Sequence, residues 1–301
     1  RDTSFWNYNE AISNWSDNGT PTFFGVGDNA VIDAATTISV RPAGVAASDV
    51  SVTNPTGTVT LNSGTLAAAS LTKTQAGTLE LAGPLSSNLV TVSAGSLTVT
   101  GIGSLEATSL VNNATVEYAV TEDRTLSAGL SGNGLLAQIG TARLTLNGVG
   151  DYAGSLSVAA GSVLELGPAA LLGPGGVYSG GIAVAGELVA ASSTGQDLVG
   201  PLTGFGTLTK SGDGVVTISG DNAGFTGLIN ATAGSLRLGS STALGGATVA
   251  VLSDGALDLG GQAISGKDIV VQGTGPGSTG ALINADTTTA ASWGGQVSLG
   301  S

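Results

Sequence analysis

The sequence predicts an all-β protein assembled from a stack of similar strand-and-turn units. Glycine accounts for 50 of the 301 residues, more than twice its usual share of roughly 7%, while aromatic residues make up only 4%. Val, Ile, Leu and Thr favour strands, and Gly, Asn and Asp favour turns. Short segments alternate apolar and polar residues with a period of two, and related segments recur along the chain. We therefore expect short strands with one buried face, separated by glycine-rich turns.

The charge balance and the missing residue types exclude several classes of protein. The chain has 8 basic and 21 acidic residues, a formal net charge of −13, and neither Cys nor His. A disulfide scaffold, a thiolate zinc site and a Ser-His-Asp triad are therefore impossible. An acidic chain also lacks the basic footprint that nucleic acids require. No apolar run reaches the roughly 18 residues that span a bilayer. We expect no cofactor, no nucleic-acid partner and no membrane-spanning segment.

Residues 1–35 differ from the rest of the chain and are predicted to form a cap or a docking segment. Six of the aromatic residues lie within the first 24 positions, namely Phe5, Trp6, Tyr8, Trp15, Phe23 and Phe24. No glycine precedes Gly19, so the segment lacks the turns of the later coils. Two interpretations stay open. The aromatic residues cover the open end of the first coils, or residues 1–20 add a strand to the exposed sheet edge of a neighbouring molecule near its Ser301 and join subunits head to tail.

Residues 36–301 contain three diverged copies of a longer repeat. A strand with two inward apolar residues recurs at 79–81, 144–146 and 216–218. The turn Ala-Gly-Ser follows it at 94–96, 160–162 and 233–235. The order of these segments is constant while the spacers vary in length. Such a pattern indicates a stack of similar units.

The third copy carries the most specific motif. It reads Gly-Phe-Gly-Thr-Leu-Thr-Lys-Ser-Gly-Asp-Gly-Val-Val-Thr-Ile-Ser-Gly-Asp-Asn over 204–222, then Phe-Thr-Gly at 225–227 and Ala-Gly-Ser-Leu-Arg-Leu-Gly at 233–239. This pattern resembles the autotransporter-associated β-strand repeat of bacterial passenger domains. The second copy lacks the Lys and the paired glycines, and the first lacks the aromatic residue. The resemblance implies a right-handed parallel β-helix, or β-solenoid, on the outside of a bacterium.

The alternation assigns an inward and an outward face to each predicted strand. We expect Glu80, Thr145, Thr217 and Arg237 to face solvent. We expect ten apolar side chains to point inward and to stack in register along the axis: Leu79, Leu81, Leu97, Leu144, Leu146, Val163, Val216, Ile218, Leu236 and Leu238.

Acid–base chemistry in a chain without histidine would depend on Asp or Glu, as in glycoside hydrolases. The candidates are scattered: Glu80, Glu106, Glu117, Glu122, Asp123, Glu165 and Glu187. Arg124, beside Glu122 and Asp123, makes the only grouping in which two acidic residues adjoin a basic one. We therefore expect no catalytic residues. The alternative, a β-helical enzyme that acts on polysaccharide, requires two or three carboxylates within about 10 Å in one groove.

Two glycine-aspartate turns bear on calcium. Gly212-Asp213-Gly214 and Gly220-Asp221-Asn222 faintly resemble the turns of calcium-loaded β-rolls. The nine-residue period of such rolls is missing, and no D-x-D-x-D-G loop occurs. We expect both segments to be ordinary corner turns and the protein to have no metal site.

These observations predict a non-enzymatic structural protein at the cell surface of a bacterium. It would act as a stalk, an adhesin or a filament subunit. Its partners would be other copies of itself or a host or neighbouring cell surface.

Overall fold

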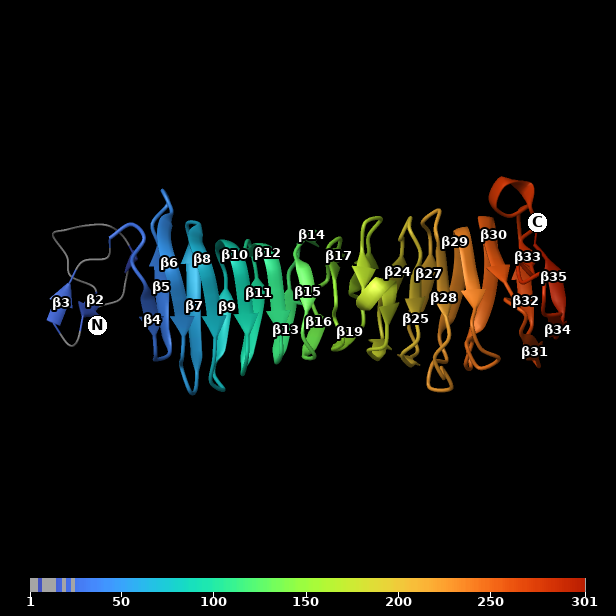
Figure 1. Ribbon diagram of the computed structural model, residues 1–301, viewed down its shortest axis with the longest axis horizontal. Helices are drawn as coiled ribbons and strands as arrows, with labels where there is room; N and C mark the ends of the chain where they lie inside the picture. The colour runs from blue at the N-terminus through green and yellow to red at the C-terminus, as the bar shows by residue number, and fades with distance from the viewer. Residues whose placement is uncertain (1–4, 7–14, 18–19, 23–24, 301) are drawn as a thin grey trace. The chain divides into compact units, whose positions relative to one another are not determined.

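The computed structural model describes residues 5–6, 15–17, 20–22 and 25–300, with side chains from residue 25 onward. It confirms the predicted all-β parallel solenoid, with about 12 turns over this part of the chain. The chain divides into two compact units, residues 1–142 and residues 143–301. Within each unit, the strands of successive coils lie side by side (Figure 1). The described residues include no α-helix, and therefore no helix that could cross a membrane.

The strands of the first unit are short and closely spaced. They are β1 (Phe5–Trp6), β2 (Trp15–Asp17), β3 (Thr20–Thr22), β4 (Ala30–Ile32), β5 (Thr36–Val40), β6 (Val45–Val52), β7 (Thr58–Ser63), β8 (Leu66–Lys73), β9 (Thr78–Leu81), β10 (Pro84–Val92), β11 (Ser96–Thr100), β12 (Ser104–Asn112), β13 (Thr115–Ala119), β14 (Arg124–Leu126), β15 (Gly129–Ser131) and β16 (Leu135–Gln138).

The second unit contains the remaining strands and two single-turn 3-10 helices. They are β17 (Arg143–Leu146), β18 (Val149–Gly150), β19 (Ser155–Val158), β20 (Val163–Leu166), β21 (Leu171–Leu172), η1 (Pro174–Gly176), β22 (Val177–Tyr178), β23 (Ile182–Val184), β24 (Glu187–Ala190), β25 (Gln196–Leu198), β26 (Leu202–Gly204), β27 (Thr207–Lys210), β28 (Val215–Ile218), β29 (Leu228–Leu238), β30 (Thr248–Asp258), β31 (Ala263–Ser265), β32 (Ile269–Val271), η2 (Pro276–Ser278), β33 (Leu282–Ile283), β34 (Ser292–Gly294) and β35 (Val297–Leu299).

Two parallel sheets form the walls of the first unit. One contains β5, β7, β9, β11, β13 and β16 in that order, and the other contains β4, β6, β8, β10, β12 and β15. Their inward side chains stack as ladders, and one such ladder comprises Val59, Leu79, Leu97, Val116 and Leu136. Every member of this ladder is completely buried. Because each coil contacts its neighbours in the same register, the core is a continuous stack of aliphatic side chains.

The strands of the second wall bend in the middle. Pairing between β6 and β8 skips Ser48 and Ala69, and pairing between β10 and β12 skips Asn88 and Thr108. The residues just before the bend are small, with Ala47, Ala68, Ser87 and Ala107 in one row. Small side chains let each strand fold inward there, so the bends of consecutive coils form a shallow trough on the outer surface.

In the second unit, two long strands each serve two walls. The first half of β29 pairs with β27 and the second half with β28. The break falls between Ala231 and Ala233, where the register with β30 also shifts. One wall therefore runs from β17 through β20, β24, β27 and β29 to β30. The other runs from β22 through β25 and β28 into the second halves of β29 and β30.

The predicted core is confirmed at nine of its ten positions. The nine side chains are at most 3% exposed. Glu80, Thr145, Thr217 and Arg237 lie between inward neighbours at half-exposed positions, as predicted.

The prediction for Val163 is wrong. Val163 stacks on the outward Arg143, and the inward residue is Leu164, which stacks on Leu144. The cause is the turn that precedes β20. Gly161 is followed by the buried Ser162, so three positions separate the turn glycine from the first inward residue instead of two in the other copies. A shift of one residue moves a side chain to the opposite face of a strand.

The close approach of consecutive coils also decides which turn positions require glycine. Gly95 has a φ of +71°, and a Cβ there would lie 2.2 Å from the carbonyl oxygen of Gly77. At the equivalent Gly161, φ is +78° but no atom lies within 4 Å of the Cβ position. Both turns favour glycine for its backbone conformation. Only Gly95 is needed in addition for contact with the preceding coil.

The N-terminal region contains two pieces of described backbone. Strand β1 pairs in parallel with β5, with Phe5 opposite Ser39 and Trp6 opposite Val40, and β2 forms an antiparallel hairpin with β3. Tyr8, Phe23 and Phe24 lie outside the described residues, as do the side chains of the other three aromatic candidates. The roles predicted for all six, as a cap or a docking segment, stay predictions.

Candidate functional site

The most distinctive polar residues lie inside the solenoid, at the ends of strands. Lys73, Gln138 and Lys210 are the last residues of β8, β16 and β27, and all three are completely buried. Each lies two positions after an inward leucine on the same strand, so its side chain also points into the core. A buried amine or amide is stable only when its donors are hydrogen-bonded.

These three side chains bind the backbone of the turn that follows them. The Lys73 Nζ donates to the carbonyls of Thr74 and Gln75, at 2.6 and 2.8 Å. The Gln138 Nε2 donates to the carbonyls of Gly140 and Ala142. At each corner, backbone carbonyls that no longer pair with a neighbouring strand thereby accept hydrogen bonds from a side chain. The corner conformation is fixed from inside the coil.

Lys210 also links two coils. Its Nζ donates to the carbonyl of Gly212 in its own turn, and to the carbonyl of Ala233 at 3.1 Å in the next coil. Alanine stacks on it from both sides, as Ala190 and Ala231, which leaves room for the long side chain. Burial lowers the pKa of Lys210 to about 8, although the nearby Asp213 carboxylate opposes the shift. Burial lowers the pKa of Lys73 as well.

Buried amides fix other corners in the same way. The Asn222 side chain accepts a hydrogen bond from the Leu202 amide at 2.7 Å and donates to the Ala243 carbonyl at 2.6 Å. It therefore connects the preceding coil to the following one. Asn112 donates to the Leu135 carbonyl at 2.8 Å. These contacts are structural, because both ends of each amide are used within the protein.

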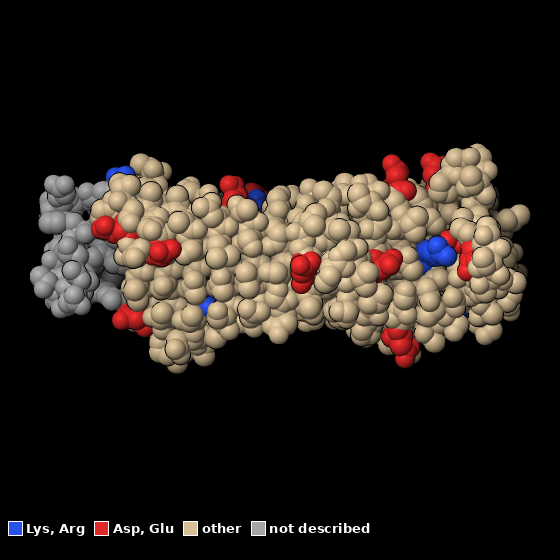
Figure 2. Space-filling model, viewed as in Figure 1, with Lys and Arg blue, Asp and Glu red and all other residues tan. Residues whose placement is uncertain are grey.

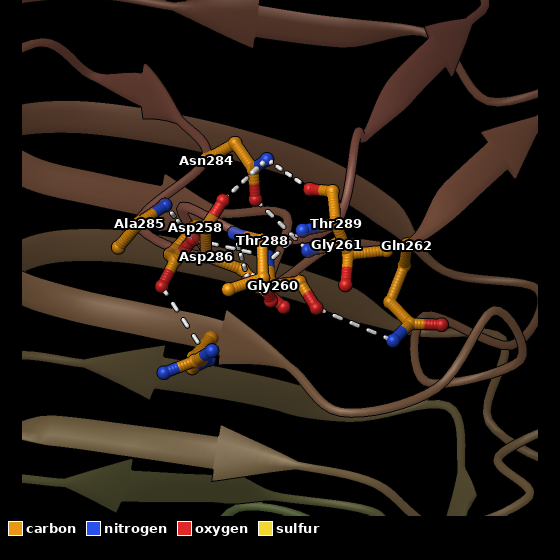
Figure 3. Close-up of polar contacts among 10 residues, drawn as sticks. Asp258, Gly260, Gly261, Gln262, Asn284, Ala285, Asp286, Thr288 and Thr289 are labelled. Atoms are coloured by element: carbon orange, nitrogen blue, oxygen red, sulfur yellow. Dashed lines mark hydrogen bonds and ion pairs between the residues drawn. The ribbon is translucent and has the colours of Figure 1, made fainter.

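A polar corner near the end of the second unit is built on Asp258 (Figure 3). This side chain is 3% exposed, and its Oδ1 accepts from the amides of Gly260 and Ala285, at 3.0 and 2.8 Å. Its Oδ2 lies 3.6 Å from the Arg237 Nε. The buried charge is thus compensated by backbone donors and by one cation.

The loop that follows is held by Asn284 and Asp286 (Figure 3). The Asn284 Oδ1 accepts from the Gly261 amide at 2.9 Å, and its Nδ2 donates to the Thr289 carbonyl at 2.8 Å. The Asp286 Oδ1 accepts from the hydroxyl and the amide of Thr288. These bonds, with one from the Thr289 amide, lower the pKa of Asp286 to about 2. Asp258 and Asp286 therefore act as acceptors for loop amides.

The carboxylates predicted as possible acid–base groups lie at exposed or half-exposed positions. Two of them, Glu106 and Asp123, line the same pocket, which is described below. Glu80 accepts hydrogen bonds from Thr60 and Thr100, at 2.8 and 2.9 Å. Glu117 lies two strands away, with Thr98 between them in register. The spacing corresponds to about 10 Å from two strand separations. Glu80 and Glu117 lie on the outer face of the first wall, and neither of them lines the trough or the pocket described below.

Three other acidic candidates each engage a polar side chain. Glu187 accepts from the Thr209 hydroxyl at 2.7 Å, Glu165 pairs with Arg143, and Glu122 pairs with Arg124 at 3.4 Å. Figure 2 shows the acidic side chains as separate spots on the face in view. Within the part of the chain that the structure describes, no three carboxylates are placed to hold a metal ion.

The two glycine-aspartate segments, expected to be ordinary corner turns, lie at corners of the solenoid. The exposed Asp221 accepts from the Ala223 amide at 3.3 Å, and the neighbouring Asn222 is the buried amide described above. Asp213 lies in the exposed turn that the Lys210 amine holds from inside. Their geometry is that of corner turns.

The trough on the second wall of the first unit is a surface pocket. It has a volume of about 500 Å³ and is lined by β6, β8, β10 and β12. A second pocket of about 370 Å³ adjoins it, because Glu106 lines both. Its other lining residues are Ile102, Ser104, Leu105, Tyr118, Asp123, Arg124 and Thr125.

The repeated segments are the parts of the chain that match a known family. The family described as passenger-associated-transport-repeat matches residues 71–99, 136–165 and 208–238. Three segments of the chain are therefore similar to this repeat. This confirms the predicted resemblance to autotransporter passenger repeats, at the three places where the sequence indicated copies. No curated protein and no solved structure is significantly similar to the chain.

The passenger-associated-transport repeats place Lys73, Gln138 and Lys210 at the same position, two residues after the first matched residue of each copy. The burial of these side chains was not predicted from the sequence, in which Lys210 appeared only as part of the motif. The signal was present in Leu208 and Lys210, which share one face of an alternating strand. The trough was also missed.

Proposed function

We propose that this chain is the passenger part of a bacterial surface protein and serves as a structural scaffold outside the cell, as a stalk or an adhesin. The observation that carries the proposal is the set of three passenger-associated-transport repeats on a parallel solenoid. The repeat residues are used for folding: apolar positions fill the core, and Lys or Gln fixes the corners. An acidic surface with few charges suits a scaffold that must remain dispersed.

Surface display is tested on intact cells of the native bacterium. A short epitope inserted at Gly277, an exposed turn position where no atom lies within 4 Å of an added Cβ, should be labelled by antibody without permeabilisation and removed by added protease. An epitope that is detected only after lysis contradicts the proposal. A deletion strain then tests the adhesin role against that of a stalk, because loss of an adhesin reduces attachment to surfaces or to other cells. A filament subunit would instead form fibres visible by negative-stain microscopy.

We also propose that the role is non-enzymatic. The engagement of Glu80 and Glu187 by threonine hydroxyls and of Glu165 by Arg143 supports this, because glycoside hydrolysis uses two carboxylates that act across one scissile bond. The purified chain should release no reducing ends from soluble polysaccharides during prolonged incubation. Release that disappears in Glu80→Gln or Glu117→Gln would establish the alternative, an enzyme that acts on polysaccharide.

A further inference from the structure

The trough and its adjoining pocket form a continuous surface on four consecutive coils of the first unit. Ala46, Ala67, Ser86 and Glu106 lie in register on β6, β8, β10 and β12, and each is at least partly exposed. Three strand separations give a length of about 14 Å along the stack. The trough is therefore long and shallow, and its small side chains leave the backbone accessible.

The pocket begins where the second wall loses a strand. Residues 104–107 of β12 pair with β10 on one side, but β15 pairs only with residues 109–111 on the other. No strand among the described residues pairs with the first half of β12 on that side, although β14 contacts β12 and contributes Arg124 and Thr125 to the pocket. This interruption of the ladder opens the 370 Å³ pocket, within the roughly 300–1,000 Å³ typical of ligand sites.

Tyr118 lines this pocket from the core side. The residue is 1% exposed, and its hydroxyl is a buried polar group for which the structure provides no hydrogen-bond partner. Burial raises the pKa of this hydroxyl, so the group keeps its proton and remains a donor. Buried polar groups without a partner are rare and costly in native proteins. A ligand or water molecule in the pocket is the remaining source of a partner.

The polar groups of the lining decide which ligand fits. Arg124 contributes little, because its nitrogens already bind the carbonyls of Gly101, Gly103 and Asp123 and the Glu122 carboxylate. The other polar groups of the lining are hydroxyls, which both donate and accept, and the Glu106 and Asp123 carboxylates, which accept. In the trough, Ser86, Asn88 and Thr108 add neutral polar groups. This set complements a ligand that is rich in hydroxyl groups and carries no strong negative charge.

We propose that the trough and pocket bind a short neutral oligosaccharide, with one terminal sugar in the pocket beside Glu106 and Tyr118 and the following sugars along the trough. The small residues of the trough floor allow a sugar ring to lie close to the strands. Because the lining offers no exposed aromatic ring for stacking, we expect weak binding, with a Kd in the range of about 1 mM. The biological meaning of this site rests on the proposed surface role, whereas the binding itself does not.

The test uses the purified chain and three named probes: maltotriose, cellotriose and N-acetylated chitotriose. Saturation-transfer NMR should detect at least one of them at 10 mM, and titration should give its Kd. Ala67→Phe fills the trough and should abolish the signal. Thr98→Phe, an outward position on the other wall, is the matched control and should leave it unchanged. Ser86→Phe provides a second block if Ala67→Phe does not fold, as judged by thermal unfolding.

The charge is tested separately. Glu106→Gln should weaken binding at least threefold, while Glu117→Gln should have no effect. The proposal is overturned if none of the three probes binds, or if binding survives both Ala67→Phe and Ser86→Phe. It is also overturned if only a pentalysine peptide binds and Glu106→Gln abolishes that binding, since the site would then recognise a cationic peptide. These outcomes are independent of antibody labelling on cells, so failure here leaves the surface role intact.

Discussion

Gln138 and Lys210 occupy the same repeat position and hold their corners with different chemistry. Each ends a strand, is completely buried and donates hydrogen bonds to carbonyls of the following turn. What the position requires is therefore a long side chain with donors at its tip. A positive charge is dispensable, and at Lys210 it carries the cost of burial.

Replacing Lys210 by Gln and by Met separates these contributions. Lys210→Gln keeps a donor for the turn, as Gln138 does naturally, whereas Lys210→Met leaves the Gly212 and Ala233 carbonyls without one. We expect Lys210→Gln to be more stable than Lys210→Met by about 1–3 kcal/mol, the cost of a buried polar group left unpaired. Urea denaturation of both variants at pH 7 measures the difference. Equal stability would mean that water replaces the amine at this corner.

The stability of the chain should rise with pH above about 8. The pKa of Lys210 is about 8 in the folded chain and near 10.5 when it is unfolded, so the unfolded state binds more protons between these values and the free energy of unfolding increases. Above pH 10 the trend reverses, because burial raises the pKa values of Tyr118 and Tyr178 and the unfolded chain ionises first.

Denaturant titrations from pH 7 to pH 11 measure this profile. Lys210→Gln should lose much of the rise between pH 8 and 10, and Lys73 contributes in the same direction. Tyr118→Phe should reduce the fall above pH 10. An identical rise in wild type and Lys210→Gln would show that the Lys210 amine does not titrate in this range.

The register of β20 is tested by a charge at two adjacent positions. Leu164→Asp places a carboxylate in the stack between Leu144 and Leu188 and should cost several kcal/mol. Val163→Asp lies beside Arg143 on the outer face and should change stability by less than about 1 kcal/mol. Thermal unfolding of the two variants gives the comparison. If Val163→Asp is instead the less stable variant, Val163 points inward, as the spacing from the Ala-Gly-Ser turn predicts.

The two equivalent turn glycines should respond differently to alanine. Gly161→Ala introduces only the strain of a positive φ, about 1 kcal/mol. Gly95→Ala adds a clash with the Gly77 carbonyl, at a Cβ distance of 2.2 Å, and should be clearly more destabilising because coil spacing must change. Denaturation midpoints of both variants decide this. If the two losses are equal, the coils can separate at Gly95 without measurable cost.

Much of the fold could be predicted from local alternation. At 79–81 and 216–218 the apolar residues repeat with a period of two and the glycines mark the corners, so face and boundary follow together. At Val163 the same procedure fails, because the sequence does not show that Ser162 belongs to the turn. Contacts with the neighbouring coil decide whether a residue between the turn glycine and the strand belongs to the turn or to the strand.

The candidate site was less accessible to sequence reasoning. The trough depends on where four strands bend, and its signal, a run of alanines at 67–69, is more typical of a helix than of a strand. The pocket depends on the absence of strand pairing on one side of residues 104–107, which is a relation between coils. The orphaned hydroxyl of Tyr118 follows from packing, since the same residue on an outer face would contact water.

The ladder of parallel coils has a mechanical consequence for each unit. A coil is bound mainly to the one before it and the one after it, so a force applied at one end of a unit is resisted by a single interface at a time. Such a unit would yield stepwise, and each step would release one coil of roughly 20 residues, or about 70 Å of extended chain. Contacts that reach across an interface, such as Asn222 with Leu202 and Ala243, would set the force of each step. Tension would then be relieved by small reversible extensions while the other coils remain folded.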